Sequence, residues 1–159
     1  MRKRFACLLS GVLVLCLTLA ACGGQGETAA QDPDPAGTAQ ALLDAGVFAD
    51  ALDTVDLEAA CQLYGIDAAA VEEGVVYASL TAGAEEIAVL RMADADAAAG
   101  AVTALEGRVA DQKAALKDYQ PDEVTKLDGA IVTRMGNTAL LVVANDAAGA
   151  QSVLDGLGK

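Results

Sequence analysis

The chain has 159 residues, a length that suits one domain, and it carries 10 lysines and arginines against 23 aspartates and glutamates. The resulting net charge of −13 argues against nucleic acid as a partner, because binding to phosphates needs clustered cations. The chain has no histidine, which removes the commonest general base and the commonest metal ligand from any candidate site.

The first 21 residues have the form of a secretory signal peptide. Arg2, Lys3 and Arg4 form a basic start, and residues 5–21 carry no charge. This apolar run is shorter than the roughly 20 residues that a transmembrane helix needs, and two glycines follow Cys22 directly. We therefore expect the segment to be removed, which lowers the net charge from −13 to −16.

Cys22 stands at the end of this signal. Leu19-Ala20-Ala21-Cys22 resembles the lipobox of bacterial lipoproteins, in which a diacylglyceryl group is placed on the cysteine sulfur before the cut. Two acyl chains hold a protein stably at a bilayer, whereas one holds it only marginally. We expect an extracytoplasmic protein anchored through diacylglyceryl-Cys22 to the outer face of the cytoplasmic membrane. The alternative is an ordinary secreted protein in which Cys22 is a plain thiol.

Residues 22–37 are predicted to form a flexible tether, because Gly, Gln, Ala, Asp and Pro dominate them. A single domain is expected over residues 38–159. It opens with three predicted short helices: one over 38–48 with Thr38 as its N-cap, one over 56–65 between a capping Asp56 and Gly65, and one over 67–74.

Two predicted hairpins follow, separated by a long helix. Residues 75–81 and 86–92 form the first, and residues 130–135 and 138–144 form the second around the turn Gly136-Asn137. The helix over 94–120, ended by Pro121, has a periodic stripe: Ala98, Val102, Leu105, Val109, Gln112, Leu116 and Tyr119. A last helix covers 146–157. The order predicts an α+β fold, with a four-stranded, mostly antiparallel sheet and the long helix across one face.

Cys61 is the one cysteine left for the domain, because Cys7 and Cys16 leave with the signal and Cys22 is blocked by lipid. It lies at helical spacing from Leu57 and other apolar residues, which predicts a buried thiol. The alternative is a reactive or intermolecular thiol.

Four features in this order resemble a known family: VVYASLTAGAEEIAVLRM over residues 75–92, EGRVADQ over 106–112, YQP over 119–121, and the hairpin at Gly136. Behind a lipobox, they resemble an uncharacterised family of Firmicutes lipoproteins catalogued as domain of unknown function 4358. The resemblance extends from Ala41 to the C-terminus, and Leu90 departs from it where an aromatic residue is more usual. That family has no assigned activity, so the resemblance supplies no catalytic residue.

Carboxylates are the remaining candidates for chemistry. Residues 94–96 begin like a calcium loop, but Ala98 replaces the next ligand, so they are predicted to cap the long helix. Residues 72–73 and 85–86 are predicted to be solvated loop ends. Of these only Glu86 is a candidate for pairing, with Arg108 or Arg134. The sequence predicts no catalytic residue, no metal site and no cofactor.

One polar position interrupts the stripe of the long helix. Gln112 occupies it, with Arg108 one turn before. A buried polar group needs a partner, so Gln112 either lies at a rim where its amide meets backbone or water, or forms a polar notch that binds a ligand or partner. In the second case Arg108, Gln112, Glu86, Tyr77 and Tyr119 are the candidate binding residues.

Three classes of function remain open. The anchor, the small size and the lack of a catalytic constellation favour a non-enzymatic binding or interaction module of the cell envelope with a protein partner. The first alternative is an accessory lipoprotein that captures a ligand for a transporter. The second is a hydrolase that works through carboxylates or calcium.

Overall fold

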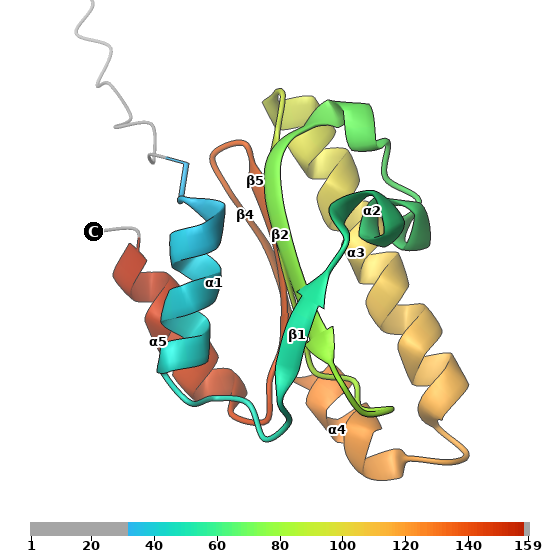
Figure 1. Ribbon diagram of the computed structural model, residues 1–159. Helices are drawn as coiled ribbons and strands as arrows, with labels where there is room; N and C mark the ends of the chain where they lie inside the picture. Colours follow the sequence, from blue (N-terminus) through green and yellow to red (C-terminus); the bar gives the residue numbers. More distant parts are fainter. Residues whose placement is uncertain (1–31, 158–159) are drawn as a thin grey trace, which may run out of the picture.

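The computed structural model describes residues 32–157. Its centre is a five-stranded antiparallel sheet in the order β1-β2-β3-β5-β4 (Figure 1). The strands are β1 (Leu52–Val55), β2 (Val71–Ser79), β3 (Glu86–Met92), β4 (Ile131–Met135) and β5 (Thr138–Val143). The helices are α1 (Pro35–Asp44), α2 (Leu57–Tyr64), the 3-10 turn η1 (Ala68–Ala70), α3 (Ala95–Leu116), α4 (Pro121–Asp128) and α5 (Ala147–Leu157).

Both predicted hairpins are confirmed. β2 pairs with β3, and β4 pairs with β5 through a turn in which Gly136 has φ 59°, a conformation that favours glycine. β3 and β5 then pair with each other, so they occupy the middle of the sheet. The α+β fold class is therefore correct, with one strand more than the four expected.

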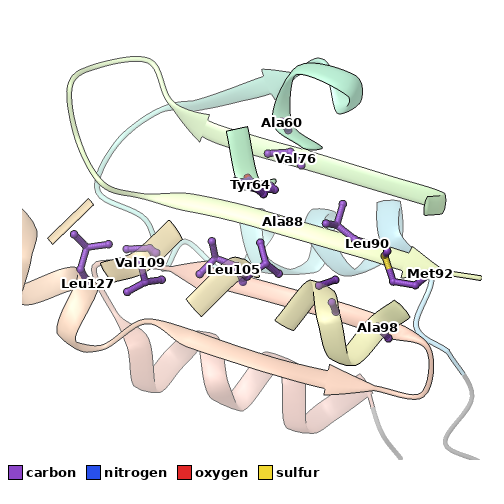
Figure 2. Close-up of a cluster of buried hydrophobic side chains, with 14 of the residues drawn as sticks. Ala60, Tyr64, Val76, Ala88, Leu90, Met92, Ala98, Leu105, Val109 and Leu127 are labelled. Carbon is purple, nitrogen blue, oxygen red and sulfur yellow. The ribbon is translucent and has the colours of Figure 1, made fainter. Parts of the chain in front are cut away.

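Helices cover both faces of this sheet. Residues of α2, α3 and α4 pack on one face, as the side chains of Tyr64, Leu105 and Leu127 show (Figure 2). On the other face Leu42 of α1 and Leu154 of α5 pack against β3 and β5. The sequence predicted only the layer that α3 forms. The second layer explains why β3 and β5 are almost wholly apolar, since both of their faces are buried.

The predicted elements are wrong in four places, and the first is α1, which covers Pro35–Asp44 instead of 38–48. β1 was missed, because four residues with two exposed polar side chains give little apolar pattern. The predicted helix over 67–74 is only the turn η1, and β2 begins at Val71. Pro121 does not end the long helix. It begins α4 instead, where its missing N–H costs nothing, while α3 ends at Leu116.

The caps agree with the sequence except at α1. Asp56 and Asp94 cap α2 and α3, and Gly65 ends α2 with φ 71°, as predicted. Helix α1 begins before Thr38, which is buried within the helix. Its N-cap is Asp34, whose carboxylate accepts a hydrogen bond from the N–H of Gly37.

The start of the described chain is attached to one end of the sheet. Asp32 Oδ1 accepts a hydrogen bond from the N–H of Asn137 at 2.6 Å, and the N–H of Met92 donates to the carbonyl of Asn137 at 2.9 Å. We call this end, with the turn Gly136-Asn137 and the last residues of β3, the entry end. The far end is the opposite one, where β3 begins, with the β2–β3 connection (80–85), the α3–α4 connection (117–120) and α4 (Figure 1).

The predictions of a signal peptide over 1–21, a lipidated Cys22 and most of the tether lie outside the described residues. The predicted boundary between tether and domain at residues 37 and 38 is wrong, because residues 35–37 are the first turn of α1. Within residues 32–157, none of the helices has the length and apolar character required to cross a membrane.

Candidate functional site

Glu86 is the centre of a buried polar cluster at the far end. It is the first residue of β3, and its side chain points to the face that α3 covers. Its Oε2 accepts hydrogen bonds from Nε and Nη2 of Arg108, both at 3.2 Å, and its Oε1 accepts one from the Tyr64 hydroxyl. Of the two predicted partners of Glu86, Arg108 is therefore the actual one. Arg134 instead donates to the carbonyl of Gly136 at the entry end.

Tyr64 belongs to this cluster and was missed as a functional residue. Its helical spacing from Cys61 indicated burial, but a local pattern cannot reveal which distant acceptor its hydroxyl meets. Burial, together with the neighbouring Glu86 carboxylate, raises the pKa of Tyr64 far above its ordinary value. The phenol is thus a fixed hydrogen-bond donor, and the cluster holds α2 and α3 to the start of β3.

The remaining candidate binding residues do not join Glu86 and Arg108 in one notch. Tyr77 packs on the opposite face of the sheet, against the layer of α1 and α5, because side chains alternate along β2. Tyr119 is exposed beyond the end of α3. Gln112 is half-buried one turn beyond Arg108, and its Oε1 finds no hydrogen-bond partner among the described residues.

A second buried cluster lies at the same end, around Glu85. Its carboxylate accepts hydrogen bonds from the N–H groups of Ala49 at 3.1 Å and Asp50 at 2.8 Å. Lys126 Nζ lies 3.0 Å from Glu85 Oε1 and 2.9 Å from Glu123 Oε1. Burial by itself lowers the pKa of Lys126, but its hydrogen bonds to Glu123 and Glu85 outweigh burial and leave that pKa raised.

This cluster corrects the prediction that residues 85–86 are a solvated loop end, because both side chains are buried and bonded. The three-residue spacing of Glu123 and Lys126 indicated a pair on one helix. Their contact with Glu85 depends on tertiary structure, so no local signal marks it. Residues 72–73 are also not a loop end, since they lie in β2, where Glu73 pairs with Arg91.

Hydrogen bonds also join the connections of the far end to one another. Glu123 Oε2 accepts from the N–H of Ala84 at 2.7 Å, which ties the β2–β3 connection to α4. Asp50 Oδ2 accepts from the Ser79 hydroxyl at 2.8 Å, and the Ser79 hydroxyl lies 2.9 Å from that of Thr81. The segment before β1, the β2–β3 connection and α4 are thus fixed relative to each other.

The hollows on the surface of the described chain include a cleft and a groove. A cleft of about 300 Å³ opens between α4 and the start of α5, lined by Asp122, Thr125, Lys126, Gly129, Ala144, Asn145 and Ala147. A groove of about 260 Å³ lies between α3 and residues 65–70, which follow α2 and include η1, and its lining is apolar or glycine except for Asp67. Residues 32–157 contain no group of three or more carboxylates or cysteines placed to hold a metal ion.

Cys61 is buried in α2, as the sequence predicted. Burial, with a smaller contribution from Asp67, raises the pKa of its thiol. The thiol therefore stays protonated at neutral pH and packs as a small apolar side chain.

Comparison with protein families gives a match to a known family. Residues 48–144 match the family described as "Domain of unknown function (DUF4358)", a span from the loop before β1 to just after β5. Neither a curated protein nor a solved structure matches the chain. The matched span contains both buried clusters of the far end.

Proposed function

The chain belongs to the DUF4358 family, and from that premise we propose that it is a lipid-anchored lipoprotein of the cell envelope whose domain binds a partner protein. It is held at the outer face of the cytoplasmic membrane by diacylglyceryl-Cys22. Its role is binding rather than catalysis.

The observation that carries this proposal is the attachment of Asp32 to Asn137. Cys22 precedes Asp32 by ten residues, which span at most about 36 Å when extended. An anchor at Cys22 is therefore connected to the entry end of the sheet, and the far end is accessible to proteins outside the membrane. This arrangement suits a module that presents one surface at a short distance from a bilayer.

The state of the buried charges supports binding over catalysis. Glu86 is bonded to Arg108 and Tyr64, and Glu85 is bonded to Lys126 and two backbone N–H groups. A general acid or base must exchange its proton with a substrate within hydrogen-bond reach. These carboxylates are instead engaged by neighbours of their own chain, which fits a role in shaping the far end.

The anchor is tested by replacing Cys22. In cells grown with a labelled fatty acid, the wild-type chain should carry label and fractionate with membranes. Cys22→Ala should lose both properties. Cys61→Ala is the matched control and should keep both, since Cys61 is buried in the domain. A wild-type chain that is soluble, unlabelled and without added mass would contradict the proposal.

A further inference from the structure

We propose that the far end is the docking surface, and that it receives a protein whose contact region is an apolar pocket rimmed by lysine or arginine. This inference rests on the proposed function, because it takes the entry end to be the anchored one. It assigns the binding role to the exposed tips Leu80 and Tyr119 and to the carboxylates beside Tyr119.

The first argument is where the exposed apolar side chains lie. Four large ones are exposed among the described residues: Tyr119 at 81%, Leu80 at 66%, Leu63 at 60% and Leu157 at 39%. The two most exposed are in the β2–β3 and α3–α4 connections, both at the far end. Tyrosine gives a large contact area with few rotatable bonds, which is why protein interfaces are enriched in it.

The second argument is that the backbone at both tips is hydrogen-bonded. The N–H of Leu80 donates to the carbonyl of Ala51 at 3.1 Å, and the N–H of Tyr119 donates to that of Leu116 at 3.0 Å. The ends of the β2–β3 connection are bonded as well, through Ser79 and Ala84. A backbone that is already ordered loses little conformational entropy on binding, so apolar side chains on hydrogen-bonded connections favour recognition.

The third argument concerns the buried charges beneath the tips. Burying a charge carries a desolvation penalty, and apolar residues of similar volume often give equal or greater stability. The far end nevertheless contains two such clusters, around Glu85 and Glu86. Their distinct effect is to fix the geometry of several connections at once, which a docking surface requires.

Charge identifies the kind of partner. Asp118 and Asp122 flank Tyr119 and are exposed, and Lys117 is the one exposed cation in the connection between α3 and α4. Exposed carboxylates therefore outnumber exposed cations next to Tyr119. Complementary potentials steer association and select partners, so the contact region of the partner is basic around its apolar centre. A second copy of this chain is equally acidic and is not the proposed occupant.

The test uses a photoreactive benzoylphenylalanine side chain introduced into the full-length chain in cells. In two variants it replaces Leu80 or Tyr119. In two control variants it replaces Leu63 or Leu157, which are exposed leucines outside the connections that carry Leu80 and Tyr119. Irradiation should give one adduct of the same mass at 80 and 119 only, and the crosslinked peptide of the partner should contain more Lys and Arg than Asp and Glu. Adding Asp118→Lys and Asp122→Lys to these variants should lower the yield of the adduct by about tenfold.

Four results would overturn the inference. The first two are the absence of an adduct at 80 and 119, and equal adducts at all four positions. The others are an adduct to a second copy of the chain, and an acidic partner peptide whose crosslinking yield does not change in the Asp118→Lys and Asp122→Lys variant. Tyr119→Ala should leave the melting temperature unchanged, which separates lost docking from lost folding. If the chain carries no lipid but gives the adduct, the proposed anchor is wrong and the proposed docking surface stands. If the chain is lipidated but gives no adduct, the anchor stands and the docking surface is wrong.

Discussion

The two ends of the sheet each contain an arginine–glutamate pair, and the pairs differ in burial. At the entry end, Arg91 and Glu73 expose 30% and 44% of their side chains. At the far end, Arg108 and Glu86 expose 21% and 3%, and Tyr64 adds a hydrogen bond to Glu86. An exposed pair contributes about 0–1 kcal/mol, whereas breaking a buried one leaves an uncompensated charge. An arginine–glutamate pair thus contributes little to stability at the entry end, whereas the fold depends on the pair at the far end.

Replacing each of the two arginines by alanine tests this comparison most directly. Arg108→Ala should lower the free energy of unfolding by about 3–5 kcal/mol, because Glu86 is left buried and unpaired. Arg91→Ala should lower it by less than about 1 kcal/mol, because solvent compensates the exposed Glu73. Urea denaturation of both variants measures the difference. Equal losses would show that burial does not distinguish the two ends.

The Glu85 cluster should give the next largest effect. In Glu85→Gln the amide oxygen still meets a backbone N–H, but the charge that faces Lys126 is gone. We expect a loss of about 1–3 kcal/mol. Glu72→Gln is the matched control, since Glu72 is exposed on β2, and it should unfold like the wild type. A Glu85→Gln variant with the same free energy of unfolding as this control would show that the Glu85 cluster does not stabilise the fold.

The loss of stability at alkaline pH should be smaller. Part of it should trace to Tyr64, along with Cys61 and Lys126, whose pKa values are also raised. Its pKa is raised above the ordinary value of 10.0, so the folded chain keeps a proton that the unfolded chain releases. This contribution is complete below about pH 10 and is lost as the pH rises further, at up to about 1.4 kcal/mol per pH unit. Urea denaturation between pH 8 and 11 should show this slope in the wild type and in Tyr119→Phe. Tyr64→Phe should show a shallower slope, and an unchanged one would contradict the assignment.

Local signals predicted the elements that depend on neighbouring residues. Gly136-Asn137 marked a hairpin, Asp56 and Asp94 marked helix starts, and the apolar spacing around Cys61 marked a buried face. In each case the physical cause lies within about four residues of the signal. The two hairpins and the long helix between them were therefore predictable.

The candidate site was less predictable, because its contacts join distant parts of the chain. The pairing of Glu86 with Arg108 was one of two options, since opposite charges alone cannot choose between arginines. Glu85 looked like a solvated loop residue, and its burial depends on Ala49, Asp50 and Lys126 arriving from other segments. Tyr77 was assigned to the wrong face, because its place depends on which face of β2 meets α3.

Amide hydrogen exchange tests the central claim most directly, namely that buried carboxylates fix the connections of the far end. The N–H groups of Ala49 and Asp50 donate to Glu85, and that of Ala84 donates to Glu123. All three lie outside helices and strands, yet we predict that they exchange far more slowly than amides of an unstructured chain. In Glu85→Gln, the protection of Ala49 and Asp50 should fall while that of core strand β5 stays. Exchange of the three amides at unstructured rates in the wild type would contradict the account.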